Sequence, residues 1–180
     1  MEVIKKIIAK ASYGQEIQAF KKDIFINTSD RKKPSEVLGC IITGAEILCC
    51  SLEENVKSGK GVNVNGRFDI NLWYGIGGDT KVAKASTNFS DIIVISAQGE
   101  EKFNNEEVRA WIQKAPNYSG ASITDRQEEP GVLVQVEYEL GAEIIGQTTL
   151  NVKVIQFEDN TEEDEAIPLE DGETLDDEDD

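Results

Sequence analysis

Apolar and polar residues alternate over residues 61–75 (GVNVNGRFDINLWYG), which is the period of a strand that covers a core with one face. The apolar set is Val62, Val64, Gly66, Phe68, Ile70, Leu72 and Tyr74. The other set is Asn63, Asn65, Arg67, Asp69, Asn71 and Trp73. Such a strand is long, since each residue adds roughly 3.3 Å. We therefore expect a kink near Gly66, where the side chain is missing.

The same alternation returns near the end of the folded part, over residues 131–157. Its apolar set is Val132, Val134, Val136, Tyr138, Leu140, Ala142 and Ile144. Gly146 and Gln147 have the composition of a two-residue hairpin turn with glycine first. We expect a return strand after that turn, with Leu150, Val152 and Val154 on one face.

Shorter apolar stretches fill most of the remaining chain. Residues 3–11 and 17–26 read as two strands separated by Gly14, although the first also fits a short helix. Two internal glycines, Gly39 and Gly44, predict a strand with bends or bulges over residues 35–50. Strands are also expected at 81–89 and 91–97, after a turn formed by residues 75–79 (GIGGD).

One segment, residues 104–116 (NNEEVRAWIQKAP), has the signals of a helix. Asn104 or Asn105 is a suitable N-cap, and two glutamates follow in the first turn. Val108, Trp111 and Ile112 have helical spacing, and Pro116 is a stop signal. We predict a helix of about ten residues that packs on the sheet, because so short a helix is marginal alone.

Together these elements predict an all-β fold, a mainly antiparallel β-sandwich-like body of about eight strands with one short helix. The body spans residues 1–157, as two packed sheets or sub-domains. Residues 158–180 hold 14 of the 35 acidic residues and no lysine or arginine, so they predict a disordered acidic C-terminal tail. The net charge of −17 therefore comes mostly from the tail, and nucleic acid and direct membrane insertion are poor expectations.

Candidate chemistry is sparse. The chain has no histidine, which removes the commonest general base and the commonest metal ligand. The GIGGD turn joins two strands instead of preceding a helix, so it does not predict a phosphate site. Paired glutamates lie in polar connections. We expect no enzyme activity, no cofactor, no metal and no catalytic residue, and we expect synthesis in the cytosol because no secretory signal is present.

Three cysteines, Cys40, Cys49 and Cys50, lie in one predicted strand. Small apolar thiols are ordinary strand residues, which is one interpretation. The other is an intermolecular disulfide once the environment becomes oxidising, since Cys49 and Cys50 point to opposite faces and one of them is exposed.

The polar face of residues 61–75 has two interpretations. It is either a solvated sheet face, on which Arg67 and Asp69 pair with each other, or a surface covered by another chain. Trp73 favours the second, because tryptophan is enriched at interface hot spots. We select Arg67, Asp69, Asn71 and Trp73 as the partner-facing set.

Three stretches of the chain resemble a known family. They are KKPSEVLGCII (residues 32–42), GKGVNVNGRFDINLWYGIGGDTKV (59–82) and VQVEYELGAEIIGQTTLNVKV (134–154), in that order and before an acidic tail. They are similar to the outer spore coat morphogenetic protein, coat protein E, of endospore-forming bacteria.

The resemblance implies a structural protein of the spore coat. Such proteins are made in the mother-cell cytoplasm, surround the forespore, self-associate into oligomers or a lattice, and recruit other coat proteins over an inner coat layer organised by its own morphogenetic proteins. It implies that the acidic tail contacts client coat proteins. An alternative of another class is a small β-sandwich recognition module that binds a polysaccharide or peptide without self-assembly, since an exposed Trp beside Asn and Asp also suits a sugar.

Overall fold

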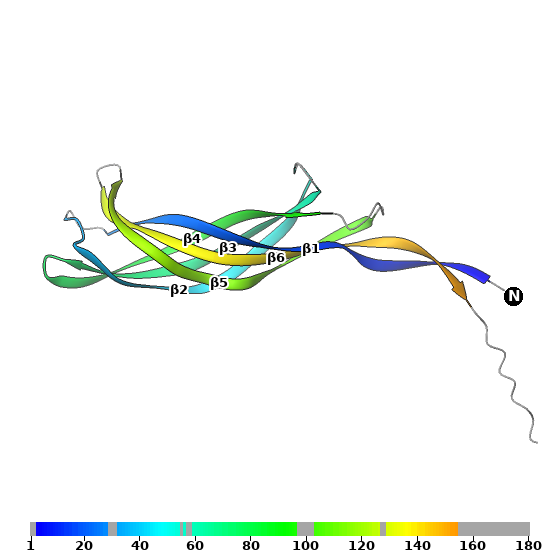
Figure 1. Ribbon diagram of the computed structural model, residues 1–180, viewed down its shortest axis with the longest axis horizontal. Helices are drawn as coiled ribbons and strands as arrows, with labels where there is room; N and C mark the ends of the chain where they lie inside the picture. Colours follow the sequence, from blue (N-terminus) through cyan, green and yellow to red (C-terminus); the bar gives the residue numbers. More distant parts are fainter. Residues whose placement is uncertain are drawn as a thin grey trace, which may run out of the picture. The chain divides into compact units, whose positions relative to one another are not determined.

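The computed structural model describes residues 3–28, 32–54, 56, 59–96, 103–126 and 129–154, and these residues form strands without any helix. The strands are β1 (Val3–Asn27), β2 (Glu36–Glu53), β3 (Lys60–Ile76), β4 (Asp79–Ile95), β5 (Asn104–Arg126) and β6 (Glu129–Val154) (Figure 1). The acidic residues 158–180 and the predicted boundary at residue 157 lie outside the described residues.

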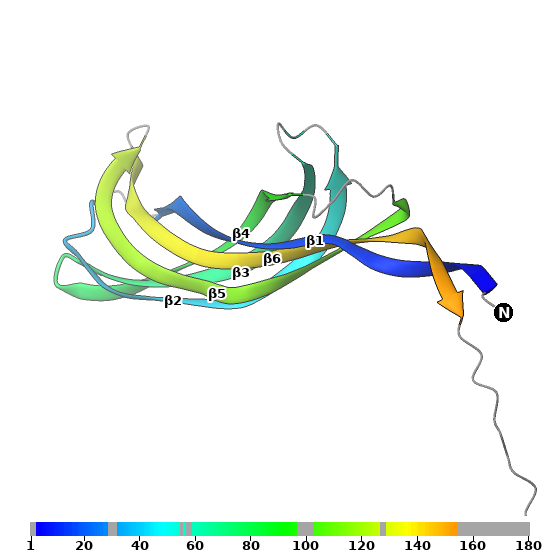
Figure 2. The same ribbon diagram turned by 45° about the vertical axis from the view of Figure 1, so that its right-hand side comes forward.

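The strands form two three-stranded sheets, ordered β2–β3–β4 and β1–β6–β5. β3 pairs antiparallel with both of its neighbours, and β6 pairs antiparallel with β5. Figure 2 shows β6 lying between β1 and β5, so the long alternating strands β3 and β6 are the central strands of their sheets.

The buried residues of the two sheets form one hydrophobic core. The predicted apolar faces are confirmed residue by residue, since all six side chains on β3 and all seven on β6 are at most 2% exposed. Phe68 of β3 packs edge-on against Tyr138 of β6, with ring centroids 6.2 Å apart. This core belongs to the compact unit Ile7–Leu150, and the described residues 3–6 and 151–154 belong to a second unit.

The described chain has six long strands instead of about eight. The strands predicted at 81–89 and 91–97 are one strand, β4, and two glycines interpreted as breaks lie inside strands, whereas the predicted helix is a further strand. Gly14 is within β1, and a Cβ there would lie 2.7 Å from Ile95 Cγ2. Gly146 is within β6, and a Cβ there would lie 2.5 Å from Phe103 Cβ. The predicted hairpin at Gly146 is therefore wrong, because this glycine provides room for a neighbouring side chain instead of a turn.

The predicted helix is also wrong, since residues 104–126 form strand β5. Val108, Ala110 and Ile112 alternate toward the core, and Trp111 lies on the other side of the strand, opposite Gly141. Pro116 lies at a register irregularity between Lys114 and Asn117, a position where a sheet tolerates a residue without an N–H. Pairing with β6 outweighs helical propensity, which is a weak determinant of structure.

The predicted bends in residues 35–50 are confirmed. Strand β2 shifts register against β3 at three places, one of which contains Gly44 with a φ of 64°. β3 itself pairs with β4 without a break through Gly66, so the irregularities lie in β2 instead of β3. The GIGGD turn is confirmed as a two-residue hairpin, in which Gly77 and Gly78 both have positive φ, as a type I′ turn requires.

Candidate functional site

The predicted partner-facing residues all lie on the side of β3 that points away from the core. Arg67 and Asp69 are exposed, and Asn71 and Trp73 are half-buried. Because β3 is the central strand, residues of β2 and β4 flank each of them. We call this surface, the outward residues of β2, β3 and β4, the β3 face.

The middle of the β3 face is polar and internally paired. Arg67 donates a hydrogen bond from Nε to Glu46 Oε1 on β2, with which it forms an ion pair. Asp69 accepts a hydrogen bond from Ser86 Oγ on β4 at 2.5 Å. The two residues thus bond to neighbouring strands, whereas the alternative interpretation paired them with each other. Exposed ion pairs of this kind contribute only about 0.2–1 kcal/mol to the free energy of unfolding.

Exposed apolar side chains lie on the β3 face near the β3–β4 turn. Trp73 is opposite Gly39 on one side and Val82 on the other. Ile41 and Val82 are 54% and 47% exposed. An open hollow of about 400 Å³ here is lined by Leu38, Gly39, Cys40, Ile41, Trp73 and Thr80. Sequence reasoning selected Trp73 and missed its aliphatic neighbours.

A second apolar group lies toward the other end of the same face. Leu48, at a register shift in β2, and Ile92 and Val94 of β4 are all exposed. The alternation of residues 79–95 could have predicted that Ile92 and Val94 point outward. It could not have predicted this for Leu48, whose exposure depends on a bulge in β2. The β3 face therefore has apolar ends and a polar middle.

The three cysteines are free thiols distributed over both sides of β2. Cys49 is exposed on the β3 face, opposite Asn65. Cys40 and Cys50 are half-buried and pack against the core. Burial raises the pKa of both half-buried thiols, which lowers the fraction of reactive thiolate. Cys49 is thus the accessible thiol of the three.

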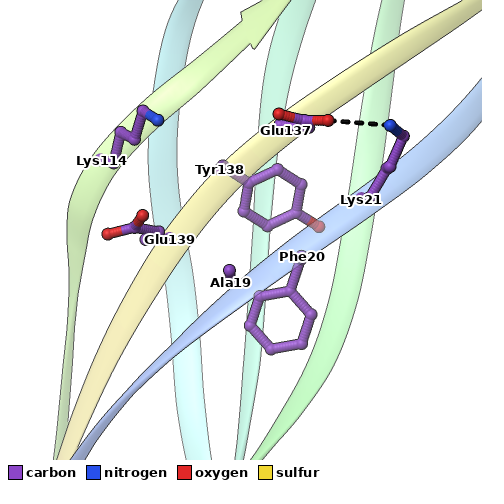
Figure 3. A pocket seen from close by; sticks show the side chains of 7 residues that line it. All are labelled: Ala19, Phe20, Lys21, Lys114, Glu137, Tyr138 and Glu139. Atoms are coloured by element: carbon purple, nitrogen blue, oxygen red, sulfur yellow. Dashed lines mark hydrogen bonds and ion pairs between the residues drawn. The ribbon is translucent and has the colours of Figure 1, made fainter. Parts of the chain in front are cut away.

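The outward surface of the other sheet has two ion pairs that join neighbouring strands. Lys21 of β1 donates to Glu137 of β6 at 2.9 Å, and Lys10 donates to Glu107 of β5 at 2.7 Å. These hydrogen bonds and charges lower the pKa of both glutamates. An open hollow of about 250 Å³ lies beside the first pair, and Lys114 and Glu139 also line it (Figure 3). We call the outward residues of this sheet the β6 face.

Two carboxylates of low exposure pair with a lysine of the opposite sheet: Glu106 of β5 pairs with Lys60 of β3, and Asp91 of β4 pairs with Lys22 of β1. The Asp91 side chain on β4 is 9% exposed, accepts a hydrogen bond from the Tyr138 hydroxyl at 2.5 Å and forms an ion pair with Lys22 at 2.8 Å. Burial, together with the nearby carboxylate, raises the pKa of Tyr138, so the hydroxyl remains a donor. Sequence reasoning missed this cluster, and the only signal was one acid at the start of the apolar run DIIVI.

In the described ranges, no three or more Cys, Asp and Glu side chains gather as metal ligands would. Among those same residues, no helix is long and apolar enough to cross a membrane. The β3 face has two exposed apolar groups on either side of a polar middle, in which Arg67 and Asp69 are paired with residues of the neighbouring strands.

Comparison with known proteins gives one match. The family of outer spore coat protein E (CotE) matches residues 3–180. No curated protein and no solved structure matches the chain. Because the match covers nearly the whole chain, the protein belongs to the CotE family, a family of spore coat structural proteins, and the resemblance of its three motifs is confirmed.

Proposed function

We propose that this CotE-family chain is a non-enzymatic morphogenetic protein of the spore coat, which assembles with copies of itself and recruits other outer coat proteins. It is made in the mother-cell cytoplasm and carried into the coat around the forespore. Family membership supports the coat location. The β3 face supports self-association.

The observation that supports the proposal is the position of exposed apolar side chains on the β3 face. Among the exposed large apolar side chains of the described residues, six lie on β2 and β4 around the polar middle of this face (Leu38, Ile41, Leu48, Val82, Ile92 and Val94), and five lie on β1 and β6. Large apolar groups gathered on one face of a sheet are a feature of contact surfaces. Trp73 and Arg67 are of the residue types most enriched at interface hot spots.

Arg67, Asp69, Asn71 and Trp73 are the proposed partner-facing set, with the two apolar ends added to it. Of the proposed disulfide residues Cys40, Cys49 and Cys50, the exposed Cys49 is the first candidate for a bond between molecules in an oxidising coat. The acidic residues 158–180 are proposed to contact basic client coat proteins by charge attraction.

The test compares the full chain with a version ending at residue 157. Light scattering and negative-stain microscopy are run over a range of concentrations, each with and without reductant. We expect both versions to form assemblies that grow with concentration, and only the full chain to bind basic client proteins. Assemblies that vanish with reductant would assign the link to the cysteines.

A strict monomer in every condition, at tens of micromolar, would contradict self-assembly. The recognition-module alternative then predicts a monodisperse chain whose thermal midpoint rises when a polysaccharide or peptide is added. The Trp73 hollow, with Thr80 at its rim, is where such a ligand would bind.

A further inference from the structure

The two sheets have four terminal strands, β1, β2, β4 and β5. The last three differ in how regularly they pair with the central strand of their sheet. β2 shifts register against β3 at three places, and β5 shifts against β6 at four. Bulges of this kind protect sheet edges, because they twist the backbone away from a new partner. β4 differs from both, since its seventeen residues pair with β3 in one unbroken register from Asp79 to Ile95.

β4 is also the last strand of its sheet. In the hydrogen-bonded order of the described strands it has one neighbour, β3, so its second edge has no strand partner there. An unbroken edge of seventeen residues is about 58 Å long at ~3.4 Å per residue. Such an edge is a template for another strand.

The sequence of β4 is complementary to itself in one antiparallel register. When two copies overlap fully, Thr87 meets its own copy at the two-fold axis. Thr80 then faces Val94, and Val82 faces Ile92, on the outward side of both strands. Lys84 faces Ser90, and no two like charges are opposite. Exposed apolar residues of one copy thus cover those of the other, which is the kind of cross-strand pair that stabilises sheets.

We propose that β4 pairs with β4 of a second copy in this register, and so joins two β2–β3–β4 sheets into one six-stranded sheet. The inference rests on the proposed self-assembly and names its first contact. The contact is isologous, because each copy uses the same edge, and it joins the two β3 faces into one wider surface.

Two double variants test the register, and they differ only in the sign of one charge. In V82E/I92E each glutamate faces a glutamate, and in V82E/I92K each glutamate faces a lysine. Both positions are more than 40% exposed, so neither variant disturbs the core, and thermal unfolding verifies this. We expect the dimer dissociation constant of V82E/I92E to rise at least tenfold. That of V82E/I92K is expected within about threefold of wild type at low salt, because opposite charges favour cross-strand pairing.

Cysteine cross-linking is a second test of the β4 register. It uses a chain in which Cys40, Cys49 and Cys50 are replaced by serine. V82C/I92C is expected to give a covalent dimer on oxidation, and V82C alone is not, because the two copies of residue 82 lie ten residues apart along the pair. If wild type assembles, and both glutamate and lysine variants assemble equally well or equally badly, the β4 register is wrong while self-assembly stands. If wild type is a monomer, self-assembly itself fails.

Discussion

The two sheets have the same number of strands and equally buried central strands, yet their outward surfaces differ. The β6 face has the Lys21–Glu137 and Lys10–Glu107 ion pairs, and the exposed large apolar side chains of this sheet lie on β1 (Ile4, Ile7, Ile8 and Ile17) and near the end of β6 (Leu150). The β3 face has one ion pair in its middle and apolar groups toward both ends. A surface of paired charges is stable in water, whereas exposed aliphatic groups gain from being covered. The comparison therefore distinguishes a surface with paired charges from the surface that we propose for self-association, within one fold.

The largest change in stability is expected from substitution of two glycines. Gly66 of β3 faces the core, and Gly141 of β6 lies on the outward side of its sheet. A Cβ on Gly66 would lie 2.2 Å from Phe89 Cζ in the core and 2.5 Å from the Glu46 carbonyl oxygen. Gly66→Ala should lower the free energy of unfolding by about 3 kcal/mol, because overpacking a filled core is costly. Urea denaturation measures the change.

Gly141→Ala is the comparison on the β6 face. Its Cβ would also meet an aromatic ring, that of Trp111, at 2.2 Å. Trp111 is half-buried on the outward side, so the ring has space to move, and the loss should be smaller than for Gly66. Gly39→Ala, with nothing within 4 Å, is the neutral control. Equal losses at Gly66 and Gly141 would contradict the distinction between a filled core and an open face.

The next largest effect is expected at the hydrogen bond between Tyr138 and Asp91, one of the contacts that join the two sheets. Tyr138→Phe removes the hydroxyl that donates to the nearly buried Asp91 carboxylate and leaves the ion pair of Asp91 with Lys22. We expect a loss of about 2 kcal/mol in unfolding free energy, since hydrogen bonds to charged groups contribute ~1.5–3 kcal/mol. Tyr118→Phe on β5 is the matched control. An unchanged denaturation midpoint for Tyr138→Phe would show that water or Lys22 satisfies Asp91 alone.

The two tryptophans sharpen the comparison of the two faces. Trp73 lies on the β3 face and Trp111 on the β6 face, and the chain has no others. Trp73→Ala should weaken self-association about tenfold, which corresponds to ~1.4 kcal/mol, while it changes the thermal midpoint little. Trp111→Ala should lower the midpoint, because the indole covers Gly141, and should leave association unchanged. Sedimentation velocity and thermal unfolding separate the two results.

The smallest effect is expected from the charged pairs of the β6 face. Lys21 lowers the pKa of Glu137, so the pair contributes stability above the ordinary carboxylate pKa, and this contribution is lost as pH falls through the lowered value. Glu137→Gln should therefore be slightly less stable than wild type at neutral pH, and the difference should vanish at strongly acidic pH. Both groups are exposed and screened, so the change is small. A larger difference at acidic than at neutral pH would contradict the assigned pair.

Sequence alternation was sufficient to place the cores of both sheets, because a half-buried strand leaves a period of two that survives in β3 and β6. It failed for β5, where helical spacing of Val108, Trp111 and Ile112 coexists with the strand spacing of Val108, Ala110 and Ile112. Only the long-range pairing with β6 decides between them.

Glycine was the second source of error. A glycine in a sequence often indicates a turn. Gly77 and Gly78, which both have positive φ, do form a turn. Gly14 and Gly146 are instead strand residues that a neighbour from elsewhere in the chain approaches closely. The aliphatic neighbours of Trp73 were missed for a similar reason, since β2 and β4 bring them to β3 only through sheet pairing.

The most direct test of the central claim, that the β3 face and not the β6 face carries self-association, is light scattering of wild type, Trp73→Ala and Trp111→Ala across a concentration series. We predict that the mass of wild type and Trp111→Ala rises with concentration, and that the Trp73→Ala curve shifts to about tenfold higher concentration. A monomeric wild type, or assembly lost in Trp111→Ala and retained in Trp73→Ala, would contradict the claim.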